Sequence, residues 1–319
     1  MHYRRLGHSG LKVSEISLGS WITFGNQIEE STAINLIKEA FAQGINFFDN
    51  ADMYAAGQAE IVMGKAIADM PREELVISSK VFWPTHKGPN GRGLSRKHIT
   101  ESIHDTLKRL GTDYVDLYFC HRYDPDTPME EVVRTMTDLV HQGKILYWGT
   151  SEWESWQVMQ AYGTARELGV IPPSMDQPQY NLFHRKRVED TLMPVCRELG
   201  IGLTTFSPLY YGILSGKYNE GIPQGSRASL DDYAWIKERI TPQRVDIVKQ
   251  LTEVARDMGI TPAQLSIAWI LRRKEVSSVI TGATSLEQLD ENLGASDAYE
   301  KMTELDIDRI FACLGTYQE

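Results

Sequence analysis

Residues Ser95–Arg122 read SRKHITESIHDTLKRLGTDYVDLYFCHR and contain the signals of one helix followed by one strand. Ser95 is a typical N-cap residue and Gly111 a typical helix stop, so the pattern predicts a helix over Ser95–Leu110. The apolar run that follows, Tyr114–Arg122, is dense rather than alternating, as is typical of a parallel strand covered on both faces. The segment therefore predicts one helix–strand unit of an α/β protein.

The same alternation of strand and helix runs along the whole chain of 319 residues. A short hairpin comes first, in which Tyr3–Leu6 is expected to pair with Leu11–Ser14. Eight inner strands are then expected at Glu15–Gly19, Ile45–Ala51, Leu75–Val81, Tyr114–Arg122, Ile145–Ser151, Ser174–Tyr180, Gly202–Leu209 and Ser277–Ala283. Helices are expected at Ser31–Gln43, Ser95–Leu110, Met129–Gln142, Trp156–Leu168, Val188–Leu199 and Pro262–Arg273.

This succession of strands and helices predicts an α/β fold of the (β/α)₈ TIM-barrel type. A doubly wound open sheet is the alternative, but it usually has about five or six strands and a G-x-G-x-x-G fingerprint after the first. The sequence lacks that fingerprint, and no linker or internal repeat interrupts it. A single barrel domain spanning residues 1–319 is therefore expected.

One repeat is far longer than the usual length of roughly 30 residues. It runs from Leu209 to Val276, and its first part is rich in glycine, serine and tyrosine. We expect a long loop after the seventh inner strand, lying over the C-terminal face of the barrel and followed by an extra helix. Long ordered loops in compact domains are usually functional.

Composition and charge narrow the class of protein. The chain is 42% hydrophobic, and its 33 Lys and Arg against 43 Asp and Glu give a net charge of −10. Such a surface repels phosphate backbones, so no nucleic-acid partner is expected. Three scattered cysteines argue for a reducing compartment, and the sequence holds neither a signal peptide nor a membrane span. We expect a cytoplasmic enzyme without membrane insertion and, because the histidines lack ligand spacing, without a metal.

Polar residues stand where the expected strands end, which is the face where TIM barrels place their chemistry. Asp49, Lys80 and His121 end the second, third and fourth inner strands, and Tyr54 lies one short loop beyond Asp49. Each alone has an ordinary structural interpretation, such as a helix cap or a solvent-exposed side chain. Their convergence on one rim is what points to catalysis.

The four side chains together suit a phenol that exchanges a proton. A free tyrosine has a pKa of about 10, too high for easy exchange at neutral pH. An ammonium such as that of Lys80 stabilises the phenolate of Tyr54, and the carboxylate of Asp49 keeps the ammonium charged. His121 can donate a hydrogen bond to a substrate oxygen. The set predicts a general acid that protonates a carbonyl oxygen as hydride reaches the carbon.

A nucleotide would have to bind without a Rossmann unit, and two segments are suited to it. Lys217 and Arg227 place two cations among small residues of the long loop. Thr281–Ser285 leads from the last strand into a helix at Leu286–Leu293, the usual phosphate position of a barrel. That helix carries polar residues suited to an adenine or ribose edge, namely Gln288, Glu291 and Asn292. Phe206 is either a flat face for a nicotinamide ring or a core aromatic.

Several longer segments resemble the aldo-keto reductases, in particular the branch of the voltage-gated potassium-channel β subunits and their bacterial reductase relatives. The matching segments are GSWITFGNQI, FWPTHKGPNGRGLSRKHI, PDTPMEEVVRTM, YWGTSEW, FSPLYYGILSGKY, GIPQGSRASL and GATSLEQLDENLGA. On this resemblance the family's catalytic tetrad falls on Asp49, Tyr54, Lys80 and His121.

The resemblance implies NADPH (NADP⁺) lying extended across the barrel mouth, with two cations favouring it over NADH. Ser151 and Gln177 would hold the carboxamide, and Phe206 would stack on the nicotinamide ring. The implied cofactor residues are Trp21, Gln27, Asp49, Ser151, Gln177, Phe206, Ser207, Leu209, Lys217, Arg227, Gly282, Thr284, Gln288, Glu291 and Asn292. Trp21 and Trp83 would line an aromatic substrate pocket.

Two departures from the branch bear on function. Channel β subunits have Asn where this chain has His121, so the complete tetrad favours a working reductase. Glu152 stands where many relatives have Asn or Arg, and it is therefore not assigned to the cofactor. We expect an NADPH-dependent aldo-keto reductase that converts small aldehydes and some ketones to alcohols. The alternatives are a cofactor-sensing regulatory subunit of a membrane channel and a different barrel chemistry, such as phosphosugar isomerisation; the channel-related branch also suggests a homotetramer.

Overall fold

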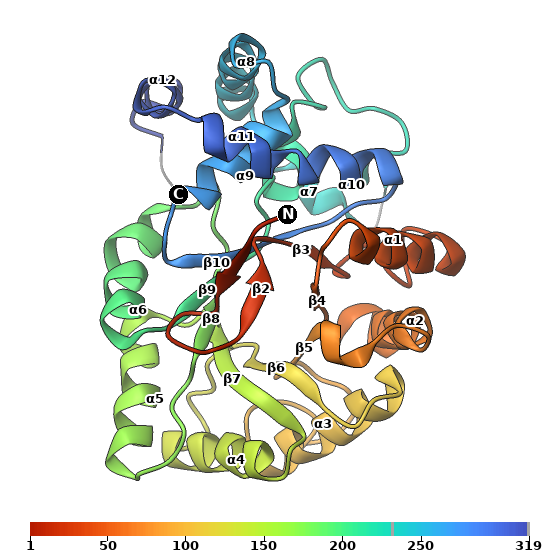
Figure 1. Ribbon diagram of the computed structural model, residues 1–319, viewed down its shortest axis with the longest axis vertical. Coiled ribbons are helices and arrows are strands. Elements are labelled where there is room, and N and C mark those ends of the chain that lie inside the picture. The colour runs from red at the N-terminus through yellow and green to blue at the C-terminus, as the bar shows by residue number, and fades with distance from the viewer. Residues whose placement is uncertain (231–232, 318–319) are drawn as a thin grey trace.

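Eight parallel strands close into a barrel in the computed structural model, which describes residues 1–230 and 233–317 (Figure 1). The strands are β3 (Ile16–Gly19), β4 (Phe47–Asp49), β5 (Val76–Val81), β6 (Val115–Cys120), β7 (Ile145–Ser151), β8 (Met175–Gln177), β9 (Gly202–Thr205) and β10 (Val276–Thr281). They pair in chain order, and β10 pairs with β3 to complete the ring. The predicted (β/α)₈ barrel is confirmed, and the open sheet is excluded.

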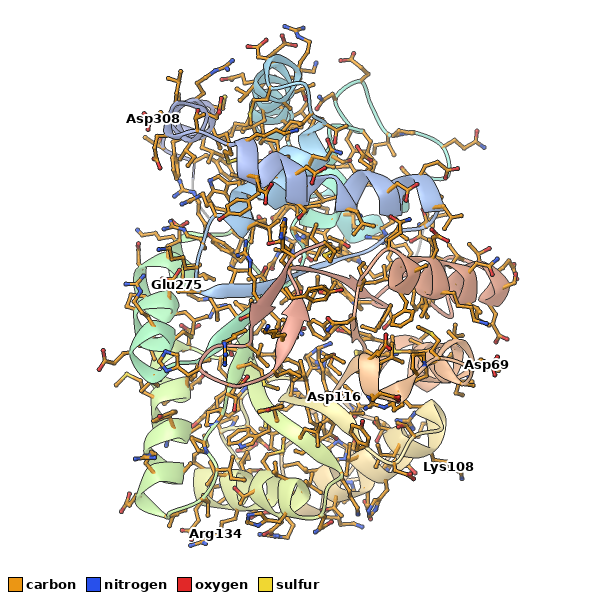
Figure 2. All side chains as sticks on the ribbon, viewed as in Figure 1. Asp69, Lys108, Asp116, Arg134, Glu275 and Asp308 are labelled. Atoms are coloured by element: carbon orange, nitrogen blue, oxygen red, sulfur yellow. The ribbon has the colours of Figure 1, made fainter. Side chains whose placement is uncertain are left out.

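Helices surround the barrel on the outside (Figure 1). They are α1 (Glu30–Ala42), α2 (Gln58–Ile67), α3 (Arg96–Leu110), α4 (Met129–His141), α5 (Ser155–Glu167), α6 (Met193–Leu199), α7 (Ala234–Lys237), α8 (Pro242–Asp257), α9 (Pro262–Leu271), α10 (Leu286–Leu293), α11 (Ala295–Lys301) and α12 (Glu304–Leu314). Ser95 caps α3 as expected, since its side chain accepts a hydrogen bond from the backbone N–H of His98. Charged side chains such as Arg134 on α4 and Asp308 on α12 lie at the rim of the molecule in Figure 2.

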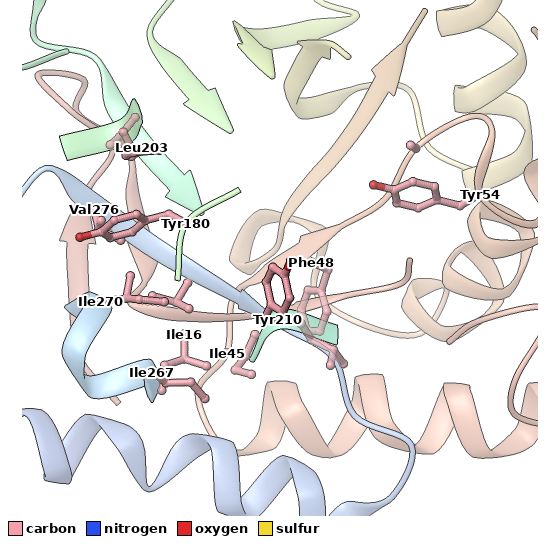
Figure 3. Close-up of a cluster of buried hydrophobic side chains, with 14 of the residues drawn as sticks. Ile16, Ile45, Phe48, Tyr54, Tyr180, Leu203, Tyr210, Ile267, Ile270 and Val276 are labelled. Atoms are coloured by element: carbon pink, nitrogen blue, oxygen red, sulfur yellow. The ribbon is translucent and has the colours of Figure 1, made fainter. Parts of the chain in front are cut away.

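The apolar core has two layers, because alternate residues of each strand point into or out of the barrel. On β6, Leu117 and Phe119 belong to the inner layer, whereas Tyr118 and Cys120 face the helices. Figure 3 shows part of the outer layer, in which strand residues Ile16 and Val276 lie near Ile267 and Ile270 of α9.

The predicted hairpin is present and closes one end of the barrel. Its strands β1 (Tyr3–Arg5) and β2 (Lys12–Ser14) are antiparallel. Leu6 and Val13, both completely buried, pack in the inner layer with the apolar residues of the barrel strands. The hairpin therefore fills the N-terminal end, and the C-terminal ends of the strands form the open face.

The long segment after β9 forms short helical turns at Tyr210–Ser215 and Arg227–Ser229, then α7 and α8. Residues 231 and 232 of this segment, like 318 and 319 of the expected domain, lie outside the described residues. β9 ends at Thr205 rather than at the expected Leu209, because Ser207 adopts a left-handed backbone (φ 55°) that a strand does not accommodate. Within the described ranges, no helix combines the length and apolar content that crossing a membrane requires.

Candidate active site

A buried carboxylate, Asp49, organises the open end of the barrel. Its Oδ1 accepts hydrogen bonds from Ser78 Oγ at 2.7 Å and from Gln177 Nε2 at 2.9 Å, and its Oδ2 accepts one from Lys80 Nζ at 2.7 Å. Ser78 and Lys80 are two residues apart on β5, so both point inward, and Gln177 ends β8. The strand period thus brings donors from β5 and β8 to one acceptor at the end of β4.

The ammonium of Lys80 is fully buried and uses all three of its hydrogens. Besides Asp49, it donates to the carbonyl oxygen of Asn50 at 2.7 Å and to the hydroxyl oxygen of Tyr54 at 3.0 Å. Burial would lower the pKa of Lys80, but the charge of Asp49, the nearby Tyr54 and these hydrogen bonds together raise it above its ordinary value. Lys80 is therefore a permanent cation held against the phenol.

Tyr54 is aimed into the barrel by an unusual backbone turn. The next two residues, Ala55 and Ala56, have left-handed conformations (φ 47° and 53°), and Gly57 follows with φ 87°. Such conformations cost free energy in residues other than glycine and persist only where the surrounding structure imposes them. The turn leaves the side chain of Tyr54 almost entirely buried, beside Lys80.

Burial decides the proton affinity of the phenol in this structure. It raises the pKa of Tyr54 above its ordinary value, although the charge of Lys80 and its hydrogen bond act in the opposite direction. The sequence indicated the charges of Lys80 and Asp49 beside the phenol, but not how deeply the ring is buried. Tyr54 consequently keeps its proton at neutral pH, which is the state that a proton donor needs.

His121 follows directly on β6 and completes the group. Its ring meets that of Tyr54 edge to face, with centroids 6.0 Å apart, and its Nδ1 is buried without a hydrogen-bond partner in the part of the chain described. Burial, then the charges of Lys80 and Arg122, lower the pKa of His121 well below its ordinary value. The imidazole is therefore neutral and can hydrogen-bond an uncharged oxygen.

A cavity of about 520 Å³ extends from Tyr54 and Asp49 along the barrel mouth to α10. All the predicted cofactor residues except Ser151 line it. Ser151 lies beneath the wall, where its hydroxyl donates to the carbonyl oxygen of Gln177 at 2.9 Å. Phe206 lines the cavity and also packs on the inner core, so both interpretations of this residue apply in part.

Two cations stand at the far end of this cavity. Arg227 donates to the side chains of Gln27 (3.1 Å) and Thr23 (3.2 Å), and burial lowers its pKa. The side chain of Lys217 is exposed toward the cavity, but protein surrounds its ammonium. This burial, followed by the charge of Arg227, lowers the pKa of Lys217 to about 8. Neither forms an ion pair with any described carboxylate. Glu291 acts on the charge of Lys217 from the same cavity wall, but two neighbouring cations that form no ion pair with described residues suit a polyanionic ligand.

The aromatic residues divide between two places. Trp21 lies at the cavity wall, edge to face with Phe206 (centroids 6.3 Å apart) and near Tyr211 (6.1 Å). Trp83 lies outside the cavity lining and packs instead against Phe82 (5.2 Å) and the ring of His121 (6.5 Å). Trp21 and Trp83, the two residues expected to line the substrate pocket, therefore lie on different sides of the tetrad.

Sequence reasoning missed several residues of the site. Ser78, which holds Asp49, could have been found from its spacing of two from Lys80 on one strand. Tyr211 and Pro223–Gly225 line the cavity because the long segment folds back over it, and no local signal marks that. Glu152 has a clear role: its carboxylate accepts hydrogen bonds from the backbone N–H of Gln179 at 2.5 Å and from Arg187 at 3.2 Å.

Comparisons with known proteins agree with this geometry. The model of the Aldo/keto reductase family matches residues 15–314, which include the tetrad and the whole cavity lining. A relative from Arabidopsis thaliana, described as a probable voltage-gated potassium channel subunit beta, is 46% identical over 314 residues. The aligned region covers 97% of this chain and 95% of the relative.

Proposed function

The chain belongs to the aldo/keto reductase family of oxidoreductases, whose members generally bind NAD(P)H, and from this premise we propose that it is an NADPH-dependent reductase of aldehydes and some ketones. The observation that carries the proposal is the position of Lys80. Its ammonium lies between the carboxylate of Asp49 (2.7 Å) and the hydroxyl of Tyr54 (3.0 Å), with the His121 ring against the phenol.

These residues can act on a carbonyl oxygen in three ways. The neutral imidazole of His121 orients the oxygen, and the hydroxyl of Tyr54 holds the proton that the oxygen receives. Lys80 stabilises the phenolate that Tyr54 becomes, and Asp49 keeps Lys80 in place and charged. When bound, the nicotinamide cofactor supplies the hydride. Because Tyr54 is buried, the donated proton comes from this phenol rather than from bulk water.

The cavity residues suit a dinucleotide with an additional phosphate. Lys217 and Arg227 would bind phosphate oxygens, and Gln288, Glu291 and Asn292 would contact the adenosine end. Trp21 and Phe206 would enclose the nicotinamide ring, with Ser151 and Gln177 at its carboxamide. What supports NADPH over NADH is the pair of cations, neither of which forms an ion pair with a described carboxylate, because a 2′-phosphate adds charge that they neutralise.

The remaining cofactor residues and the quaternary state are part of the same proposal. Gln27, Ser207, Leu209, Gly282 and Thr284 line the cavity along the cofactor's path. The likeness to channel β subunits supports a homotetramer, which light scattering on the purified protein tests. The three scattered cysteines support a cytoplasmic location.

A regulatory subunit of a membrane channel is the second candidate, and it is favoured by the name of the 46% identical relative. The histidine at position 121, beside an intact Asp49–Lys80–Tyr54 group, supports catalysis instead. Oxidation of NADPH at 340 nm with a reactive aldehyde such as 4-nitrobenzaldehyde tests the proposal. Turnover on the order of 1 s⁻¹ is expected. Tight binding of NADPH without turnover would support the regulatory alternative, and no binding of NADPH would support a different barrel chemistry.

A further inference from the structure

Two guanidinium groups lie beside one tryptophan at the edge of the tetrad. The Cζ atom of Arg122 is 5.7 Å from the centroid of the Trp83 ring, and that of Arg92 is 5.3 Å from it. The same ring lies 6.5 Å from that of His121. Arg122 follows His121 in the chain, and Arg92 belongs to the loop between β5 and α3. Residues from two loops thus place two positive charges next to the reacting groups.

Neither arginine has a carboxylate partner among residues 1–230 and 233–317. Arg122 makes one hydrogen bond, from Nη1 to the carbonyl oxygen of its neighbour His121, so most of its five N–H groups stay available. Arg92 is exposed, and its guanidinium lies over two aromatic rings, those of Phe82 and Trp83. Both guanidinium groups thus lie beside the same ring with N–H groups that an anion could accept from.

The acidic residues nearby are already engaged. Glu152 pairs with Arg187 and with the backbone of Gln179. Asp124 accepts three neutral donors, which are the backbone N–H groups of Leu94 and Asp126 and the hydroxyl of Thr127.

The remaining acid, Asp176, is bonded to Thr150, and burial raises its pKa to about 7. It is therefore partly protonated at neutral pH and offsets little positive charge. The charge of Glu152 acts on Arg122, but within the described residues no carboxylate bonds to the guanidinium of Arg122 or Arg92, so their N–H groups stay open to a ligand although the chain as a whole carries −10.

Arg122 is also close enough to act on the catalytic groups. Its charge contributes to the lowered pKa of His121 and opposes the raised pKa of Tyr54. The geometry agrees, because the Trp83 ring beside Arg122 lies 6.5 Å from that of His121, which in turn lies 6.0 Å from that of Tyr54. The half-buried position of this side chain strengthens its attraction for an anion, because water screens it less.

We propose that the carbonyl substrate of this reductase carries a carboxylate, which binds to Arg122 and Arg92 beside Trp83 while the carbonyl group faces Tyr54 and His121. The planar fork of a guanidinium matches the two oxygens of a carboxylate. The inference rests on the proposed reductase function, and it adds the class of substrate.

Two nearly isosteric aldehydes test it, 4-carboxybenzaldehyde, which is an anion at neutral pH, and 4-carbamoylbenzaldehyde, which is neutral. We expect kcat/KM at saturating NADPH to be roughly 10- to 100-fold higher for the acid. This ratio should fall toward one in Arg122→Gln and fall partially in Arg122→Lys, which keeps the charge but loses the fork. Added salt should also reduce it.

Arg134→Gln is the matched control, because Arg134 lies on the outer face of α4, paired with Glu130 (Figure 2). The ratio of kcat/KM for the acid to that for the amide should be the same in Arg134→Gln as in the wild type. If Arg122→Gln does not fold, the same ratio of kcat/KM values can be measured in Arg92→Gln, because Arg92 is exposed. A wild-type ratio of one or less overturns the inference. So does an Arg122→Gln variant in which the KM for NADPH rises and the ratio is unchanged, since the arginine would then serve the cofactor.

Failure of the reductase proposal would look different. If neither aldehyde is reduced, binding of the acid and the amide can still be compared by quenching of tryptophan fluorescence. Selective binding of the acid that is lost in Arg122→Gln would retain the anion site without the reaction. Equal binding of the acid and the amide would contradict the proposed anion site as well.

Discussion

The side-chain amide of Gln177 donates a 2.9 Å hydrogen bond to Oδ1 of Asp49, joining the ends of β8 and β4 across the barrel. The same carboxylate holds Lys80 through its other oxygen. Asp49 therefore links the ion pair at Tyr54 to the wall of the cavity. Any change at Asp49 should affect both the stability of the barrel and its chemistry.

Asp49→Asn should lower the free energy of unfolding by roughly 3–5 kcal/mol, because Lys80 would remain as a buried cation without a counter-charge. Urea denaturation followed by circular dichroism measures the change. The double variant Asp49→Asn/Lys80→Met removes both charges and should recover part of this loss while staying inactive. Equal stability of Asp49→Asn and the wild type would mean that the pair contributes nothing to folding.

Tyr54→Phe should reduce kcat for aldehyde reduction by about 10³-fold, since it removes the proton donor and leaves the ring in place. Binding of NADPH, measured by fluorescence titration, should stay nearly unchanged. Tyr162→Phe on α5 is the control and should behave like the wild type. Full reductase activity of Tyr54→Phe would refute the assignment of the acid.

Arg227→Ala should weaken NADPH roughly 10- to 100-fold and NADH far less, because the arginine is expected to contact the 2′-phosphate that only NADPH carries. Dissociation constants for both cofactors, measured in the same buffer, give the comparison. Arg256→Ala, at an exposed position on α8, serves as the control. Equal losses for NADPH and NADH would contradict this role.

Asp52→Asn should change how stability depends on pH. Asp52 is 3% exposed, and burial raises its pKa to about 7, against the hydrogen bond from Ser102 (2.6 Å). From about pH 4 to pH 7 the unfolded chain loses this proton and the folded one keeps it. The wild type should therefore lose stability on the order of 4 kcal/mol from this group as pH rises through that window.

Urea denaturation at pH 4.5, 6 and 7.5 measures this dependence, and in Asp52→Asn the contribution should be missing. Asp69→Asn, at an exposed position, should keep the wild-type profile. A profile of Asp52→Asn that parallels the wild type would show that burial does not perturb this carboxyl.

Much of the fold could be predicted from the sequence because its signals are local. Ser95 and Gly111 bound a helix by their own backbone preferences, and the dense apolar runs locate the strands to within a few residues. The gathering of Asp49 and Lys80 followed from one rule, that parallel strands end on the same face. What depends on the packing of distant segments could not be predicted in this way.

Three features show the limit. The pKa of Tyr54 depends on burial by residues distant in sequence, and the local sequence DNADMY does not show how deeply the ring is buried. Ser151 lies beneath the cavity wall because its hydroxyl bonds to the Gln177 carbonyl, a contact between two strands. The positive charge beside Trp83 is visible only once two loops have been placed in space.

Leu6 and Val13 of the hairpin fill the N-terminal end of the barrel, so the reacting groups are reached from one direction only. For the proposed reaction this geometry sets an order of events. A long ligand lying along the cavity has to arrive before a small one that covers its reactive end, and it has to leave last. An excess of the small ligand should then delay departure of the long one, so that substrate inhibition at high aldehyde concentration becomes a kinetic signature of the plugged barrel.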